Sequence, residues 1–404
     1  MAEVGGKTVA LARAVKSVDP SAEVFGGVSY GFNEIYNLQN APDWPQYSSR
    51  YKRYVSALLA MTRDSSNASG RRLMDVLDVH WYPDLYIPIT GNAVDSTSAA
   101  ARVQAPRSLW DSTYVENGWI GQWYSPVSLL PNLKTAIALN NPGTKLSVSE
   151  FDYGAPSHIT GGIAIADVLG IFGKYGLYFA SHWGPLDGFV GAAYALYRNY
   201  DGKGSSFGDV HIRATTGDVT DCTVYASLAS TGPGEFHVVL INKNFSRSVA
   251  SSVTIAGAPV SGTGSAYVLS GVDSAVHASA AAITLINNKF SYTLSPLSAA
   301  HIVIRTLTGT APAASLPRAF ALAQNYPNPF NPATTIRYAL PARGNVRLDV
   351  YTLLGQHVAA LAEGVQDAGE HEVRFDAGLL ASGAYLYRLR SGSSVLTRSM
   401  LLVR

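Results

Sequence analysis

Glu150 is the residue whose type and position point most directly to chemistry. It ends a short apolar run that starts at Lys145 (KLSVSE), a pattern typical of a buried strand. A carboxylate there costs free energy unless it is paired, hydrogen-bonded or placed in a cleft. One interpretation is a salt bridge at the strand end. The other is glycoside hydrolysis, in which one carboxyl group attacks the sugar or activates water and a second protonates the leaving oxygen.

Aromatic and histidine side chains end two other apolar runs, as HWY at 80–82 and as HW at 182–183. Any one of them could be a core residue, with the histidine satisfied by a hydrogen bond. Together they favour a sugar-binding cleft, because aromatic faces suit the C–H faces of pyranose rings and aromatic surface near solvent often marks a ligand site. Three more tryptophans crowd residues 110–123: Trp110, Trp119 and Trp123.

Other classes of site find no support in the sequence. There is no G-x-S-x-G nucleophile motif, no G-x-x-x-x-G-K-[ST] phosphate loop and no H-E-x-x-H zinc motif. Cys222 is the only cysteine, which excludes an intramolecular disulfide and a thiol cluster. The histidines lack the spacing of metal ligands, and we expect no metal site. A net charge of +2 provides no strong field for nucleic acid, and no apolar run is long enough for a membrane span.

The elements that must position these residues alternate between strand and helix over residues 1–205. Strands are predicted at 23–30, 75–82, 145–153 and 177–183, and helices at 51–63, 126–140 and 163–175. This order predicts parallel βα units, four of which make half of a (β/α)₈ TIM barrel; a small open α/β sheet is the alternative. An amphipathic helix at the N-terminus is also expected, with one face formed by Val9, Leu11, Ala12, Val15 and Val18.

The remainder of the chain has the composition of β-structure. Residues 206–308 carry short Val/Ile/Thr/Ser runs separated by Gly, Ser and Asn turns, which predicts an antiparallel β-sandwich. Residues 309–316 form a Thr/Ala/Pro linker. Residues 317–404 resume strand alternation and predict a small C-terminal β-sandwich, for which an accessory immunoglobulin-like module is one interpretation.

Several long motifs resemble glycoside hydrolase family 44: DVLDVHWYPD at 75–84, the segment at 101–123, and KLSVSEFDYGAPSH at the start of 145–183. The family consists of endoglucanases, several with xyloglucanase activity, that pair a (β/α)₈ barrel with a β-sandwich and hydrolyse with retention. The resemblance implies that Glu150 is the nucleophile, at the end of strand seven. Combined with the strand-end pattern, it predicts these substrate contacts: His80, Trp81, Tyr82, Trp119, Trp123, Tyr153 and Trp183.

One departure from the family affects catalysis. The family's general acid/base lies in an Asn-Glu-Pro motif at the end of strand four, and these 404 residues contain no such motif. Asn33-Glu34 is followed by Ile35, and we interpret Glu34 as a solvated loop residue. The resemblance therefore predicts an α/β partial barrel holding strands five to eight, truncated at its N-terminus. We expect this fragment to have negligible activity, since a retaining mechanism needs both carboxyl groups.

The segments QNYPNPFNPATTIRYALP and LLASGAYLYRLRSG resemble the C-terminal sorting domain of type IX secretion. This implies export to the cell surface or medium of a Bacteroidetes-like bacterium, with the type IX machinery as a partner. The partners expected are thus a β-glucan polysaccharide and the secretion machinery, without nucleic acid. No organic cofactor is implied; calcium binds to some members of the family, but the sequence assigns no calcium ligands here.

Two further interpretations remain open. A non-catalytic, surface-displayed remnant would bind glucan through its tryptophans without hydrolysing it, and a structural adhesin would do neither. The sequence does not separate cellulose from xyloglucan as the preferred substrate.

Overall fold

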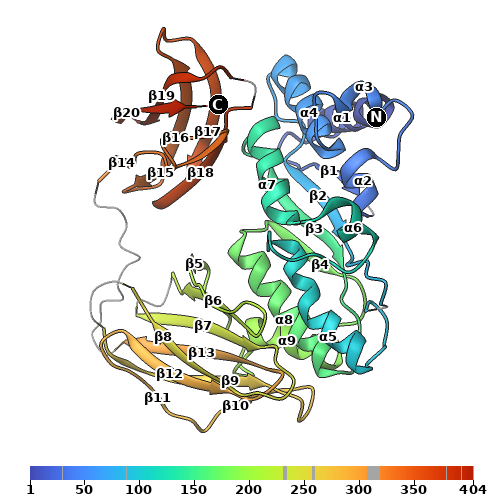
Figure 1. Cartoon of the computed structure of the whole chain (residues 1–404), viewed down its shortest axis with the longest axis vertical. Coiled ribbons are helices and arrows are strands. Elements are labelled where there is room, and N and C mark those ends of the chain that lie inside the picture. Colours follow the sequence, from blue (N-terminus) through green and yellow to red (C-terminus); the bar gives the residue numbers. More distant parts are fainter. Residues whose placement is uncertain are drawn as a thin grey trace.

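The computed structural model describes all residues except 30, 88, 231–233, 257–259, 307–318, 379, 393 and 404, so the predicted linker at 309–316 lies outside the described residues. Four parallel strands form the first sheet, in the order β1-β2-β3-β4 (Figure 1). Their bounds are β1 (Phe25–Ser29), β2 (Val76–Trp81), β3 (Lys145–Phe151) and β4 (Phe179–His182). All four strands predicted for this part of the chain are therefore present and parallel.

Helices connect and cover these strands. They are α1 (Ala2–Val18), α2 (Phe32–Asn37), α3 (Pro45–Ser48), α4 (Tyr54–Ser69), α5 (Ser96–Gln104), α6 (Trp119–Tyr124), α7 (Leu129–Asn140), α8 (Ile159–Lys174) and α9 (Gly188–Arg198), with a 3₁₀ turn at Ala105–Leu109. Parallel strands need such crossovers, and the near-continuous burial of β2 is typical of a strand covered by helices. In the described residues β1 and β4 each pair on one side only.

Helix α1 forms where the sequence predicts it, but only part of the predicted apolar face is buried. Val9 and Ala12 are buried, whereas Leu11 and Val18 are 68% and 88% exposed. The helix instead buries Lys16, whose ammonium pairs with Asp75 at 2.7 Å. Apolar residues lie on two sides of this helix, and their spacing alone does not say which side packs.

The second unit is all β. Its larger sheet has the order β10-β9-β13-β7-β6-β5, with β11 also paired to β9, and β12 pairs with β8 in a separate two-stranded antiparallel sheet. The bounds are β5 (Val210–Ile212), β6 (Cys222–Leu228), β7 (Glu235–Asn242), β8 (Val249–Thr254), β9 (Gly262–Leu269), β10 (Val276–Ala278), β11 (Ile283–Leu285), β12 (Lys289–Leu294) and β13 (Ser298–Thr306). The pairings are antiparallel, as the sequence predicts for this region.

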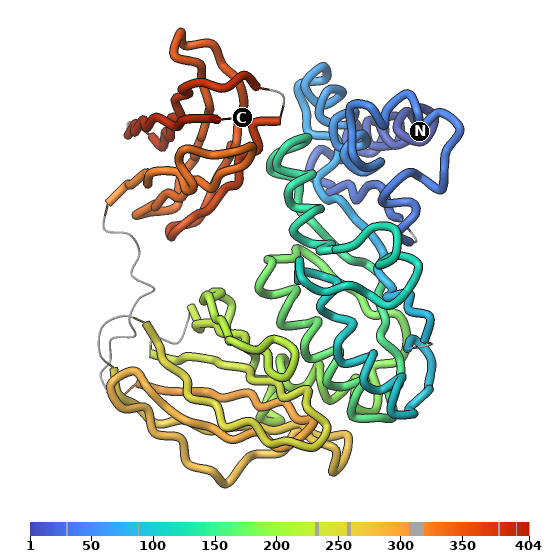
Figure 2. The backbone as a smooth tube through the Cα atoms, viewed as in Figure 1, coloured from blue at the N-terminus to red at the C-terminus, as the bar shows by residue number. Residues whose placement is uncertain are grey.

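This second unit packs directly against helices α8 and α9 (Figure 2). The ring of Tyr225 lies so close to Gly170 of α8 that a Cβ there would come within 2.2 Å of it. Beneath this contact a fully buried ion pair joins Lys243, after β7, to Asp167 of α8 at 3.3 Å. Asp167 also accepts hydrogen bonds from Thr223 (2.7 Å) and Tyr225 (2.5 Å) of β6. The α/β and all-β parts therefore share one buried interface.

The C-terminal part contains two antiparallel sheets, β14-β15-β18 and β17-β16-β19-β20. The strands are β14 (Ala321–Leu322), β15 (Ala333–Leu340), β16 (Gly344–Thr352), β17 (His357–Gln366), β18 (Gly369–Asp376), β19 (Gly383–Ser391) and β20 (Ser394–Leu402). They enclose a core of their own that includes Tyr338, Leu348 and Tyr387. Within the described residues, no helix has both the length and the apolar character that crossing a membrane requires.

Candidate active site

The carboxyl ends of β2 and β3 bring together the three residues that the sequence singles out most strongly. The Tyr82 hydroxyl donates a hydrogen bond to Oε1 of Glu150 at 2.6 Å. Nδ1 of His80 lies 3.3 Å from Oε2 of the same carboxylate, close enough for an ion pair but without hydrogen-bond geometry. The side chain of Glu150 is 25% exposed, so this carboxylate is held in place and still reachable from solvent.

Tyr82 remains a hydrogen-bond donor over the whole physiological range. Burial raises the pKa of its hydroxyl far above the usual value, and the bond to Glu150 and the nearby charge of Asp152 raise it further. Because the phenol keeps its proton, Tyr82 donates this hydrogen bond and the Glu150 carboxylate accepts it. The hydrogen bond from Tyr82 therefore restrains one oxygen of the Glu150 carboxylate.

A second carboxylate, Asp152, follows Glu150 on the same face of the chain. It accepts the backbone N–H of Gly154 at 2.9 Å and lies 3.9 Å from Nε2 of His182. Burial lowers the pKa of His182, with Asp152 partly opposing the shift, so the imidazole is neutral near pH 7. Through its hydrogen bond to Gly154, Asp152 stabilises the loop that follows β3.

A pocket of about 350 Å³ opens next to Tyr82. Trp119 of α6 forms one wall, and its indole N–H donates to the Asp84 carboxylate. The remaining lining residues are Gly31, Phe32, Asn33, Glu34, Pro83, Thr90 and Ile120. The pocket combines aromatic surface with several polar groups, a composition that suits a sugar ring. Glu34 lies in this lining and on helix α2, so its interpretation as a loop residue is wrong.

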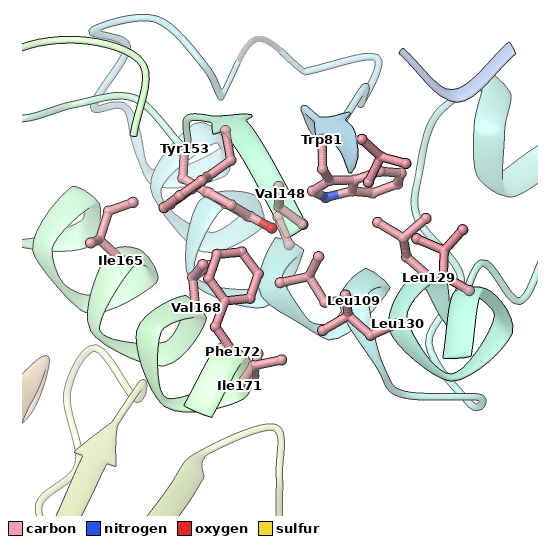
Figure 3. Close-up of a cluster of buried hydrophobic side chains, with 14 of the residues drawn as sticks. Trp81, Leu109, Leu129, Leu130, Val148, Tyr153, Ile165, Val168, Ile171 and Phe172 are labelled. Atoms are coloured by element: carbon pink, nitrogen blue, oxygen red, sulfur yellow. The ribbon is translucent and has the colours of Figure 1, made fainter. Parts of the chain in front are cut away.

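Two of the predicted substrate contacts are wrong. Trp81 is 1% exposed and Tyr153 is 0% exposed, and both belong to the hydrophobic core between the sheet and its helices. Figure 3 shows them among Leu109, Val168 and other apolar side chains. The physical reason is strand alternation: neighbours of a cleft-facing residue point to the opposite face. No ligand reaches either ring without unfolding this core.

The remaining predicted contacts lie at or near the surface. Trp123 is 73% exposed on α6, one turn from Trp119. Trp183 is 63% exposed just after β4, and its backbone N–H bonds to the carbonyl of Phe151 at 2.9 Å. Trp119 borders the pocket, whereas Trp123 and Trp183 lie outside its lining.

Sequence reasoning missed two buried charged residues that hold the loops around the pocket. Glu116 is 1% exposed and accepts hydrogen bonds from Ser108 and, at 2.8 Å, from the backbone N–H of Asp84. Arg102 is 0% exposed and donates to the carbonyl of Tyr153 at 2.9 Å. The only signal was that each is a charged residue in a region with apolar neighbours, which many surface residues share. The described residues contain no cluster of three His, Cys, Asp or Glu side chains placed to share a metal ion.

The burial of Glu116 beside the pocket can be tested by the pH dependence of stability. Burial raises the pKa of its carboxyl, although hydrogen bonds from Ser108 and Asp84 partly oppose this. Because the pKa is higher in the folded state, Glu116 contributes to folding stability at pH values below its ordinary pKa of 4.5. That stability contribution is lost as the pH rises through the folded-state pKa. Glu116→Gln cannot ionise, so we expect its melting temperature relative to the unmodified chain to increase between pH 4.5 and pH 7. An exposed control, Asp64→Asn, should show no such trend, and a pH-independent difference for Glu116→Gln would contradict a raised pKa at this site.

Comparison with known proteins adds family relationships to this geometry. Residues 1–85 match the model of Glycoside hydrolase family 44, and residues 324–403 match that of a Secretion system C-terminal sorting domain. Endoglucanase A of Paenibacillus lautus is 43% identical over 311 residues, which are 75% of this chain and 44% of that protein. Beta-mannanase/endoglucanase A of Caldicellulosiruptor saccharolyticus is 46% identical over 270 residues, 63% of this chain and 20% of that protein.

Solved structures give the same relationship. A Paenibacillus polymyxa xyloglucanase of family 44, determined with xyloglucan, superposes with a TM-score of 0.72 at 43% identity, over 75% of this chain and 61% of that one. The family 44 endoglucanase of Clostridium thermocellum superposes equally well, with a TM-score of 0.72 at 41% identity and the same coverage. The chain thus spans less than two thirds of the length of these relatives.

Proposed function

Because the chain is a member of glycoside hydrolase family 44, we propose that it is a retaining endo-β-1,4-glucanase acting on cellulose, xyloglucan or mixed glucans. Glu150 is the proposed nucleophile. The observation that supports this most directly is its carboxylate, held by Tyr82 at 2.6 Å and 25% exposed at the end of β3. The neighbouring pocket with Trp119 supports a sugar as the ligand. The relatives named as endoglucanases and xyloglucanase support the substrate class.

In the proposed first step an oxygen of Glu150 attacks the anomeric carbon. The bond from that carbon to the leaving oxygen breaks, the oxygen takes the electron pair and a proton, and a glycosyl ester forms on Glu150. Water then attacks the same carbon, loses a proton to a base and releases Glu150 as a carboxylate. Tyr82 orients the carboxylate before attack, since its own proton does not dissociate.

The first step also needs a proton donor for the leaving oxygen. The 404 residues contain no Asn-Glu-Pro motif, and we propose that this chain lacks the acid/base residue of its family. A sugar hydroxyl is a poor leaving group without protonation, so we expect negligible hydrolysis of carboxymethylcellulose. An aryl glycoside with a strongly acidic phenol needs no proton and should still react with Glu150.

The reaction of 2,4-dinitrophenyl β-cellobioside therefore tests the proposal. We expect a burst of dinitrophenolate close to the enzyme concentration and a mass increase of one cellobiosyl group on the peptide that contains Glu150. Azide attacks the ester without a base, so adding it should restore turnover and produce β-cellobiosyl azide. A chain that shows neither a burst nor a mass increase would contradict the nucleophilic role.

Tyr82→Phe removes the hydrogen bond to Glu150 and little else. A hydrogen bond to a charged group contributes on the order of 1.5 to 3 kcal/mol, so the burst rate constant should fall roughly 10- to 100-fold. Stopped-flow absorbance of dinitrophenolate measures it. Tyr86→Phe is the matched control, because Tyr86 is 65% exposed and bonds only to Gln122 among the contacts described for its hydroxyl. Equal rates for both variants would argue against an orienting role for Tyr82.

A second candidate function is glucan binding without turnover, as a surface-displayed remnant. The exposed indoles of Trp123 (73%), one turn from Trp119 on α6, and of Trp183 (63%), together with the missing acid/base motif, favour it. Under either function, Trp119→Ala should weaken cellotetraose binding about tenfold, because an aromatic platform contributes about 1 kcal/mol or more. Isothermal titration calorimetry measures this. Tyr326→Ala, which removes an 82% exposed ring from the C-terminal part, should have no effect. Binding without a burst would favour this second function.

We further propose a division into four segments: 1–205 as the second half of a (β/α)₈ barrel, 206–308 as a β-sandwich, 309–316 as a linker and 317–404 as the sorting domain with an immunoglobulin-like sandwich. The parallel order β1-β2-β3-β4 supports the half-barrel, and two antiparallel sheets with their own core support the last unit. The sorting-domain match supports export by type IX secretion to the surface or the medium. Deleting 317–404 should then retain the protein inside the producing cell.

A further inference from the structure

Strand β3 contains one residue more than its neighbour β2 at the site. Val79 of β2 lies opposite Val148 of β3. The next residue of β2, His80, lies opposite Glu150, so Ser149 has no counterpart in β2. This is a β-bulge, which inserts an unpaired residue and re-aims the side chains that follow it. Bulges between parallel strands are rare, and this one immediately precedes the proposed nucleophile.

The pairing with β4 gives independent evidence for the same bulge. Ala180 lies opposite Val148 and His182 lies opposite Phe151, so two steps along β4 match three along β3. Val148 and Phe151 are both 0% exposed in the core. In a regular strand, side chains two residues apart share a face, so Glu150 would point with Val148 into the core. The bulge reverses this parity and turns Glu150 to the face of the cleft.

The carboxylate of Asp78 accepts hydrogen bonds from the backbone and the side chain of the bulged residue, Ser149. Asp78 is 2% exposed, and its Oδ1 accepts the backbone N–H of Ser149 at 3.1 Å. Its Oδ2 accepts the hydroxyl of Ser149 at 2.5 Å. Oδ1 also accepts the hydroxyl of Ser147, the in-register partner of Asp78. No salt bridge of the described residues includes Asp78, so its hydrogen-bond partners are three neutral donors from Ser147 and Ser149.

An acceptor at this position is what the bulge needs. The N–H of a bulged residue has no ladder partner, and a buried amide without an acceptor costs free energy. Without the Asp78 acceptor, the chain can remove this cost by sliding β3 into regular register. That register would carry Glu150 from Tyr82 toward the apolar side of the sheet.

We propose that Asp78 is a positioning residue that stabilises the bulge at Ser149 and thereby aims Glu150 at the cleft. The catalytic consequence rests on the proposed role of Glu150 as nucleophile, whereas the structural consequence does not. Asp78 itself touches no substrate in this role. It acts through the backbone of the residue that precedes Glu150.

The test compares Asp78→Ala with Asp78→Asn. Alanine removes every acceptor, so the burst rate constant with 2,4-dinitrophenyl β-cellobioside should fall about 100-fold, the effect of misplacing a reacting group by about 1 Å. Cellotetraose affinity should change less than about threefold, because the pocket is formed by other elements. Asparagine keeps an oxygen for the Ser149 N–H and can donate to its hydroxyl, so it should retain the rate within about fivefold.

Two measurements do not depend on catalysis and separate a failure of this inference from a failure of the proposed function. In a crystal structure of Asp78→Ala, the contact between Tyr82 Oη and Glu150 should lengthen beyond hydrogen-bond distance; a preserved 2.6 Å contact would overturn the positioning role. Asp78→Val, of similar size, replaces the alanine variant if that does not fold. In the unmodified chain, the Ser149 amide should exchange slowly with solvent deuterium, although it has no partner strand, and fast exchange would also overturn the inference. A normal burst in Asp78→Ala would also overturn the inference about Asp78, even if Glu150 is confirmed as the nucleophile.

Discussion

Replacing Glu150 by glutamine should abolish the burst of dinitrophenolate, lowering its rate roughly 10³-fold or more, or about 4 kcal/mol in activation free energy. Glutamine has the shape of glutamate and can still accept the hydrogen bond from Tyr82, so the local structure should persist. It cannot form a glycosyl ester that azide or water would release. Stopped-flow absorbance and intact-protein mass spectrometry measure the loss. A Glu150→Gln chain that still becomes glycosylated would place the nucleophile elsewhere.

The stereochemistry of azide rescue gives a sharper control. Glu150→Ala leaves space beside the anomeric carbon, and azide bound there attacks directly from the face that the carboxylate occupied. One displacement inverts the anomeric centre, so this variant should form α-cellobiosyl azide, whereas the unmodified chain forms the β-anomer by two displacements. Proton NMR distinguishes the two products. The β-anomer from Glu150→Ala would show that another residue carries the glycosyl group.

Replacing Lys243 by methionine should destabilise the folded chain strongly. The substitution leaves the Asp167 carboxylate without its cation at a site where both side chains are 0% exposed. Breaking a buried ion pair costs on the order of 3 to 5 kcal/mol, because the remaining charge is uncompensated. The melting temperature of the α/β and β-sandwich parts should fall by roughly 10 °C, as measured by differential scanning calorimetry.

A double substitution tests whether the uncompensated charge is the cause. Lys243→Met with Asp167→Asn has no buried charge, and the amide can still bond to Thr223 and Tyr225, so most of the stability should return. Lys7→Met is the surface control, since Lys7 and Glu3 are 71% and 76% exposed and such pairs contribute less than about 1 kcal/mol. A double variant as unstable as Lys243→Met alone would assign the loss to packing.

The elements of the α/β part could be predicted because their signal is local. Parallel strands covered on both faces are continuous apolar runs, and the predicted runs at 75–82 and 145–153 contain β2 and β3 with small differences at their ends. The helix predicted at 163–175 overlaps α8, which begins earlier, at Ile159, because the His158 side chain caps it by accepting the backbone N–H of Thr160. Spacing could not tell which side of α1 is buried, since that depends on elements far away in the chain.

The directions of the site's side chains could be predicted for some residues and not for others. Strand alternation already indicates that Trp81 points away from His80 and Tyr82, so its burial could have been predicted from the sequence. Glu150 is the opposite case. Alternation alone would place it with Val148 in the core, and only the three-strand register shows the bulge that reverses its direction. A bulge in a parallel pair leaves no pattern of residue types in a single sequence.

In the part of the chain that the structure describes, the outer sides of β1 and β4 are unpaired, which has a consequence for handling the purified protein. Each exposes a row of backbone donors and acceptors, together with large apolar side chains: Phe25, Val28, Tyr178 and Phe179 are 39%, 53%, 49% and 47% exposed. Such rows are templates for strand addition between molecules. Light scattering should therefore rise with protein concentration and time, and assays of this chain are best performed dilute, soon after size-exclusion chromatography.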